Sequence, residues 1–219
     1  MFSLKKVRDR LWHLEFDLQY DLTMTFIRYS EYYEGKEAKG RKLELIDLIE
    51  MFSKNGKFTY FTDWSGFNIK SKDVFKIHKE GISDLNRYDE MMLVIFKFIL
   101  AKEGTDEFYV IGTSQDDPDK NGTFNHELAH GIYYVDKEYN KKATELVEKL
   151  PPKVKKKIFS VLKSMGYHDY VLVDEANAYL STGLVDKIDT EEIKSFQVPF
   201  IKLFNKYSKG LRKRVPKNA

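Results

Sequence analysis

The clearest alternation of apolar and polar positions lies in the C-terminal half of the chain. Two consecutive stretches repeat apolar residues at offsets i, i+4, i+7, i+8 and i+11: Tyr139, Ala143, Leu146, Val147 and Leu150, then Val154, Ile158, Val161, Leu162 and Met165. Each set lies on one face of a helix, so the pattern predicts two amphipathic helices. Pro151 and Pro152 separate them, and we expect Gly166 to end the second. Further helices are predicted over residues 170–182 and 190–208.

The N-terminal half has a mixed pattern. Helices are predicted over residues 4–33, 43–53 and 86–103, which are rich in helix-forming and apolar residues. In residues 57–70, aromatic and β-branched side chains flank the sequence Asp63-Trp64-Ser65-Gly66, a combination typical of a β-hairpin. Residues 107–114, EFYVIGTS, predict a short strand that ends at a cluster of turn-forming residues.

These elements indicate an α+β fold that is mostly helical, with a small mixed sheet in its N-terminal lobe. We expect one domain over residues 1–205, with an N-terminal lobe of residues 1–122, a helical lobe of residues 123–205, and a basic tail of residues 206–219. Hydrophobic residues make up 42% of the chain and aromatic residues 15%, which is enough to bury a core. A largely disordered chain is therefore not expected.

Composition also bears on membrane insertion, on secretion and on the kind of metal ligand available. The longest apolar run, Met91–Ala101, contains Lys97 and is too short and too charged to span a bilayer. The N-terminal residues lack the uninterrupted apolar segment of a secretory signal. We therefore expect a soluble cytoplasmic protein without a membrane span. Cysteine is absent, so that any metal must be held by histidine and carboxylate side chains.

The formal net charge of +3 is unevenly distributed along the chain. Residues 206–219 hold six Lys and Arg residues and no acidic residue, so the rest of the chain is mildly acidic. A basic tail is one way of contacting nucleic acid or an anionic membrane. The alternative is a solvated chain end, which is the more common case. We therefore do not expect nucleic acid to be a partner.

The sequence HELAH, residues 126–130, is the strongest candidate for chemistry. Residues four apart on a helix share one face, so His126 and His130 are placed to bind the same metal ion. Glu127 is rotated off that face and can reach a metal-bound water. The alternative is an ordinary helix with two surface or core histidines. Against it, two neutral histidines and a buried glutamate would each need a polar partner in a core.

A catalytic zinc requires a third protein ligand and an open position for water. Glu175 in the sequence VDEANAYLSTG is the best candidate, because it lies on a predicted helix. Asp136, ten residues after His126, and His168 are the alternatives. Asp136 can also serve as the N-cap of the helix that follows it. The side chain of Asp174 points about 100° away from that of Glu175 on a helix, so we expect it to face solvent or cap.

The combination of HELAH with a downstream DEANAY resembles the gluzincin class of zinc peptidases. DEANAY is similar to the second motif of the ImmA/IrrE-type peptidases and of the membrane CAAX-type gluzincins. The resemblance covers only these two short motifs. It implies a zincin-like metallopeptidase domain that binds one zinc ion per chain. By motif match it implies His126, His130 and Glu175 as zinc ligands and Glu127 as the catalytic base.

The resulting hypothesis is a zinc metallopeptidase that acts on a peptide or protein substrate. The zinc would activate a water molecule, and Glu127 would transfer its proton to the leaving amine. Tyr179 and His168 are candidate donors to the transition state, although a core aromatic and an ordinary loop histidine are the alternative interpretations. Residues 108–113 are predicted to form an exposed edge strand that pairs with extended substrate.

Two other functions remain open at the level of sequence. One is a zinc hydrolase acting on an amide other than a peptide bond, which fold and motif do not separate from a peptidase. The other is a non-catalytic binding or regulatory protein with a structural metal site and a tail that contacts nucleic acid. An intact Glu127 favours catalysis, because a purely structural metal site does not need a base.

Overall fold

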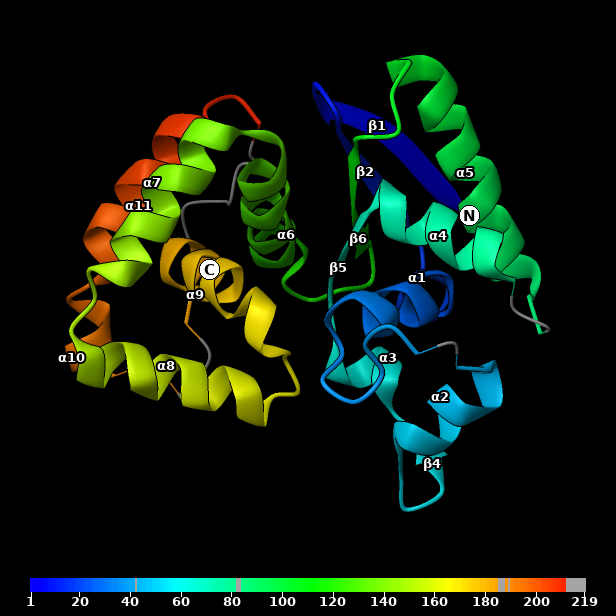
Figure 1. Cartoon of the computed structure of the whole chain (residues 1–219), viewed down its shortest axis with the longest axis horizontal. Helices are drawn as coiled ribbons and strands as arrows, with labels where there is room; N and C mark the ends of the chain where they lie inside the picture. The colour runs from blue at the N-terminus through cyan, green and yellow to red at the C-terminus, as the bar shows by residue number, and fades with distance from the viewer. Residues whose placement is uncertain (42, 82–83, 185–187, 189, 212–219) are drawn as a thin grey trace. The chain divides into compact units, whose positions relative to one another are not determined.

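The computed structural model describes residues 1–41, 43–81, 84–184, 188 and 190–211. Its elements form an α+β structure, as predicted, in which helices predominate and the main sheet is small and mixed (Figure 1). The chain divides into two compact units, Met1–Lys120 and Asn121–Ala219. We call them the N-terminal and the C-terminal unit. Within the described residues, no helix combines the length and apolar composition needed to cross a membrane.

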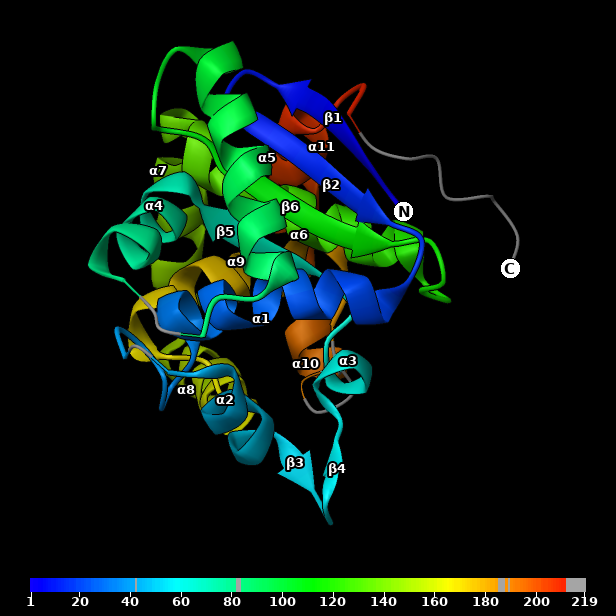
Figure 2. The same ribbon diagram turned by 90° about the vertical axis from the view of Figure 1, so that its right-hand side faces the viewer.

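The N-terminal unit contains a four-stranded sheet. Its strands are β1 (Phe2–Arg8), β2 (Leu11–Phe16), β5 (Phe67–Lys70) and β6 (Tyr109–Ser114), in the order β1-β2-β6-β5. The β1–β2 and β5–β6 pairs are antiparallel, whereas β2 and β6 run parallel, with Leu11 opposite Tyr109. Figure 2 shows β1, β2 and β6 side by side. The predicted helix over residues 4–33 is therefore wrong in its first half, because β2 pairs with β6, about 100 residues away, and that pairing overrides local helix propensity.

Helices pack on one face of this sheet. They are α1 (Gln19–Glu34), α4 (Ser71–Glu80) and α5 (Arg87–Glu103). Gly112 of β6 shows how closely α1 approaches, since a Cβ atom there would lie 2.7 Å from Phe26 and 2.8 Å from Leu22. Larger side chains at this position would push α1 away from the sheet. The predicted helix over residues 86–103 is confirmed, with Asn86 capping its first turn and Gly104 ending it in the left-handed conformation.

The region between α1 and β5 corrects a second prediction. It contains α2 (Leu45–Met51), a hairpin of β3 (Ser53–Lys54) and β4 (Lys57–Phe58), and α3 (Tyr60–Asp63). Asn55 and Gly56 form the hairpin turn with φ values of 53° and 74°. Asn-Gly readily adopts this left-handed backbone, which matches the twist of the paired strands. The hairpin predicted over residues 57–70 is therefore wrong.

The strand predicted over residues 107–114 is confirmed as β6, but its expected role as an exposed edge is wrong. β6 lies between β2 and β5 and uses the hydrogen-bonding groups of both its edges within the sheet. All six of its residues are buried. An extended substrate therefore cannot pair with this strand.

The C-terminal unit is helical. Its elements are α6 (Lys120–Val135), α7 (Lys137–Glu148), α8 (Pro152–Ser164), the 3₁₀ turn η1 (Asp169–Val171), α9 (Leu172–Thr182), α10 (Glu191–Lys194) and α11 (Gln197–Tyr207). The helix α9 packs against α7, α8 and α11. The two predicted amphipathic helices are confirmed, and the apolar faces of α7 and α8 are largely buried. The predicted helix over residues 190–208 is interrupted at Ser195–Phe196, and residues 212–219 of the basic tail lie outside the described part of the chain.

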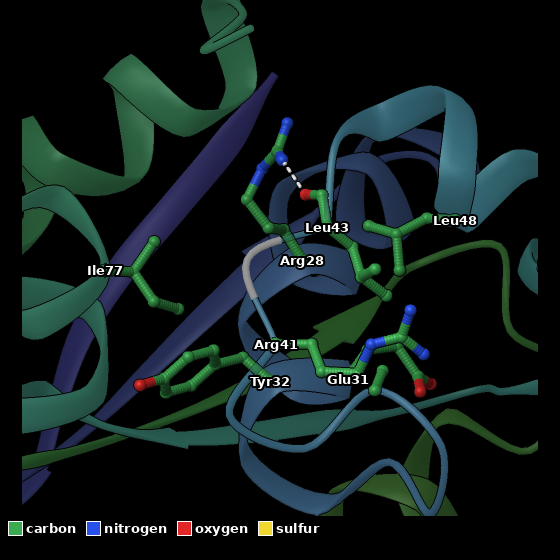
Figure 3. A pocket seen from close by; sticks show the side chains of 8 residues that line it. Arg28, Glu31, Tyr32, Arg41, Leu43, Leu48 and Ile77 are labelled. Carbon is green, nitrogen blue, oxygen red and sulfur yellow. Dashed lines mark hydrogen bonds between the residues drawn. The ribbon is translucent and has the colours of Figure 1, made fainter. Parts of the chain in front are cut away.

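A small pocket in the N-terminal unit is held together by buried charged groups (Figure 3). Arg28 donates to the carbonyl oxygen of Leu43 and lies 3.1 Å from carboxylate oxygens of both Asp84 and Asp89. Glu31, which also lines the pocket, accepts a hydrogen bond of 2.5 Å from the hydroxyl of Tyr60. Both polar groups are thus bonded to other groups of the protein, and their role is structural.

Glu31 gives a prediction about stability and pH. Burial raises the pKa of this carboxyl group from 4.5 to about 7, although the hydrogen bond from Tyr60 opposes the shift. The unfolded chain therefore loses this proton at a lower pH than the folded chain, and the free energy of unfolding falls as pH rises from 4.5 to about 7. The loss amounts to about 3 kcal/mol for a shift of this size.

We expect Glu31→Gln to remove that part of the pH dependence, because the amide does not ionise. The measurement is urea unfolding of both proteins between pH 4.5 and 8, with the exposed Glu37→Gln as a control for the loss of one charge. Parallel stability curves for wild type and Glu31→Gln would contradict the prediction.

Candidate metal centre

The helix α6 places the two histidines of HELAH on one face, as the spacing predicts. The Nε2 atoms of His126 and His130 lie 3.2 Å apart, and the two rings are nearly perpendicular, with an interplanar angle of 76°. The side chain of His130 is 2% exposed and that of His126 is 18% exposed. Both rings thus direct the same nitrogen to one point, at the edge of the buried interior.

The helix α9 brings Glu175 to the same point. Its carboxylate oxygens lie 3.6 Å from Nε2 of His130 and 3.8 Å from Nε2 of His126. The three ligand atoms lie within 4.8 Å of one another. A tetrahedral zinc ion with bonds of about 2.0–2.1 Å holds its ligand atoms about 3.3–3.4 Å apart. The cluster therefore has the donor types and nearly the spacing that such an ion requires.

The polar groups of the cluster are incompletely satisfied by protein atoms. Oε2 of Glu175 is buried and has no hydrogen-bond partner within the described residues. An unsatisfied carboxylate oxygen at 3% side-chain exposure is costly unless a cation or a proton compensates it. The residues present therefore fit a bound metal ion.

The pKa values of the cluster also fit a bound metal ion. Burial and the neighbouring His130 hold the pKa of His126 well below 6.5, so His126 is a neutral imidazole with a free lone pair. Burial also lowers the pKa of His130, but Asp174 and Glu175 outweigh it and hold the value well above 6.5. Burial raises the pKa of Glu175 to about 8, against the influence of His130. Without a cation the site thus retains protons that a metal ion would displace.

Glu127, the expected base, lies beside this cluster. The residue is 5% exposed, and its charge raises the pKa of both His130 and Glu175. That influence requires its carboxylate to be near the two ligands, because the interaction between charges falls with distance. The structure thus brings together His126, Glu127, His130 and Glu175, as predicted from the sequence.

Tyr179 also reaches the cluster, and it brings a partner that the sequence did not reveal. The centroid of its ring lies 4.5 Å from that of the His126 ring, and its hydroxyl lies 3.3 Å from the hydroxyl of Tyr167. Tyr167 is 8% exposed, and its hydrogen bond to Glu175 lowers the pKa of that carboxyl group. Tyr167 lies eight residues before Glu175, in the loop that leads to α9, and no local pattern marks it.

His168 and Asp136, the alternative third ligands, lie outside the ligand group. His168 begins η1, where its Nδ1 accepts a hydrogen bond of 3.4 Å from the backbone N–H of Tyr170. The side chain of Asp136 accepts from the backbone N–H groups of Glu138 and Tyr139 at 3.1 and 3.0 Å. The prediction that Asp136 caps the following helix is confirmed.

The prediction that Asp174 faces solvent or caps a helix is wrong. Its side chain is 16% exposed and does not face solvent, because Oδ1 lies 3.1 Å from Nδ1 of His130. Helix geometry separates the directions of Asp174 and Glu175 by about 100°, but an imidazole carries nitrogens on two sides of its ring. Glu175 approaches one of these nitrogens and Asp174 the other. A rule that could have found Asp174 is that a metal-bound histidine needs an acceptor at its second nitrogen.

No protein-family model matches this chain, and neither a curated protein nor a solved structure is significantly similar to it. The assignment of the site therefore rests on its own residues and geometry.

Proposed function

We propose that this protein is a zinc-dependent metallopeptidase of the gluzincin type, with a zincin-like domain. The observation that carries the proposal is the convergence of HELAH and DEANAY. The two motifs, whose ligands His130 and Glu175 are 45 residues apart in the chain, place two imidazoles and a carboxylate within 4.8 Å, with Glu127 beside them. This set of two His and one Glu is typical of catalytic zinc sites, which leave a fourth position for water.

Zinc is the metal that the donor set favours. Two imidazole nitrogens and one carboxylate oxygen, in nearly tetrahedral spacing and without cysteine, match the ligands of zinc hydrolases. Zinc bound there would lower the pKa of a water molecule towards neutrality and polarise a substrate carbonyl.

Glu127 has the position of the general base. Its carboxylate would accept a proton from the attacking water and deliver it to the nitrogen of the departing amine. His126 is the most exposed of the three ligands, which places the approach for water and substrate on its side.

Tyr179 lies on that same side. We propose that its hydroxyl donates a hydrogen bond to the oxygen that becomes negative when the carbonyl is attacked. The neighbouring hydroxyl of Tyr167, 3.3 Å away, would hold the phenol in place. Backbone and side-chain donors aimed at a developing oxyanion are a major source of rate acceleration in peptide hydrolysis.

We expect Tyr179→Phe to lower kcat by about tenfold to a hundredfold, at or below the usual cost of removing one oxyanion donor. Zinc content should not change, since the hydroxyl is not a ligand. The matched control is Tyr170→Phe, which removes a hydroxyl from a neighbouring tyrosine that is 40% exposed. A Tyr179→Phe enzyme with wild-type kcat would leave Tyr179 only a packing role.

The proposed function is tested by digesting a defined library of synthetic peptides and analysing the products by mass spectrometry. Three samples are compared: zinc-loaded protein, protein stripped with a chelator, and stripped protein to which one equivalent of zinc has been returned. We expect cleavage in the first and third samples only. Peptides left intact by fully loaded protein, together with hydrolysis of simple non-peptide amides, would assign the site to another class of zinc hydrolase.

A further inference from the structure

The two histidine ligands each contact a second residue through the ring nitrogen that faces away from the metal position. Nδ1 of His130 lies 3.1 Å from Oδ1 of Asp174, and Nδ1 of His126 lies 3.5 Å from Oγ1 of Thr182. Both partners come from α9, the helix that also carries Glu175. One helix thus supplies a ligand and the groups that contact the other two ligands.

We infer that Asp174 and Thr182 are positioning residues that fix both histidines as Nδ1–H tautomers and so direct Nε2 to the metal, with Asp174 the dominant of the two. The inference rests on the metal site of the proposed function. It identifies two residues that are not ligands but raise the affinity of that site for its metal.

The chemistry of the two partners determines the tautomer. In the metal-bound protein, where His130 would be neutral, the acceptor oxygen of Asp174 beside Nδ1 places the remaining proton of the ring on that nitrogen. The hydroxyl of Thr182 has one hydrogen, which it donates to the carbonyl oxygen of Ala178 at 2.8 Å. Towards His126 it can therefore only accept, and the proton of that ring is again on Nδ1. In both rings the lone pair is left on Nε2, the atom that faces Glu175.

The two contacts differ in strength. The carboxylate of Asp174 lies 3.1 Å from His130, and its side chain is only 16% exposed. The neutral hydroxyl oxygen of Thr182 lies farther from His126, at 3.5 Å. A charged acceptor attracts the N–H group of an imidazole more strongly than a neutral oxygen does. A carboxylate acceptor also makes the imidazole a better electron donor to a metal. Removal of Asp174 should therefore weaken zinc binding more than removal of Thr182.

The test is the dissociation constant of Zn²⁺, measured by competition with a chromophoric chelator on the full-length protein. We expect Asp174→Ala to weaken zinc binding by roughly 10–100-fold, the usual effect of losing such a partner. Asp174→Asn should fall between wild type and Asp174→Ala, because its amide oxygen is an acceptor at the same place without the charge. Thr182→Val, which keeps the shape of the side chain, should weaken binding by less than about tenfold.

Two further measurements separate positioning from a purely structural role. The first is thermal unfolding of the metal-free proteins, in which Asp174→Ala should still unfold cooperatively, so that its loss of zinc affinity is a property of the folded protein. The second is the absorption spectrum of the Co²⁺-loaded proteins, whose ligand-field bands should change in Asp174→Ala and remain similar to wild type in Asp174→Asn. The control is Asp169→Ala, which removes a carboxylate that is 70% exposed and pairs with Lys163.

The possible outcomes distinguish this inference from the proposed function. Equal zinc affinity in wild type and Asp174→Ala would overturn the inference alone. A lower melting temperature of metal-free Asp174→Ala, with unchanged zinc affinity of the folded protein, would also overturn it and show a structural ion pair. The expected series of affinities in a protein that cleaves no peptide would support the inference and remove the peptidase assignment. A wild-type chain that binds no zinc would overturn both.

Discussion

Glu175→Ala is expected to empty the metal site and abolish hydrolysis. Removal of this residue leaves only two imidazoles, and two ligands do not define a closed site for zinc. The affinity for zinc should fall by more than the 10–100-fold that is typical when a residue outside the ligand set is lost. The measurement is zinc content after dialysis against a weak chelator, together with cleavage of a peptide found in the library digestion.

The control for this prediction is Asp136→Ala. Asp136 is the rival ligand from the sequence, and in the structure it caps α7. Loss of such a cap typically costs about 0.5–2 kcal/mol of stability. Asp136→Ala should therefore be less stable than wild type but keep its zinc. An Asp136→Ala protein without zinc, beside a Glu175→Ala protein with zinc, would show that the third ligand has been assigned to the wrong residue.

Glu127→Gln, in contrast to Glu175→Ala, should retain the zinc ion but lose catalytic activity. The amide keeps the size of the side chain and is not among the three ligands, so fold and zinc content should match wild type. It cannot take a proton from water, so turnover should fall by roughly 10²–10⁴-fold, the scale of a positioned general base. The measurement is the steady-state cleavage rate at equal zinc content.

Glu145→Gln makes the matched control for this variant. It changes an exposed glutamate on α7 in the same way and should leave the rate unchanged. Wild-type rates in zinc-loaded Glu127→Gln would exclude this carboxylate as the base. Loss of both zinc and activity would instead indicate that Glu127 supports the structure of the site.

Local signals in the sequence were sufficient for α5, α7 and α8 and for most of the site. The four-residue spacing of His126 and His130 depends only on helix geometry, and so does the capping by Asn86 and Asp136. These features involve residues close together in the chain. Their placement follows from a single helix and does not depend on the rest of the fold.

The features that the sequence did not reveal depend on contacts between distant residues. The strand β2 was predicted as helix because its partner β6 lies about 100 residues further along the chain. For the same reason, the central position of β6 could not be distinguished from an edge. Asp174 and Tyr167 were missed as parts of the site because each contacts a ligand through space, in a direction that no periodic pattern defines.

The claim on which the other proposals depend is that HELAH and DEANAY form one zinc centre. Diffraction data collected above and below the zinc absorption edge, from crystals of the zinc-loaded protein, test it most directly. We expect one anomalous peak per chain, at about 2.0–2.2 Å from Nε2 of His126, Nε2 of His130 and a carboxylate oxygen of Glu175. A peak bound through Nδ1 of either histidine, or one that excludes Glu175, would contradict the account.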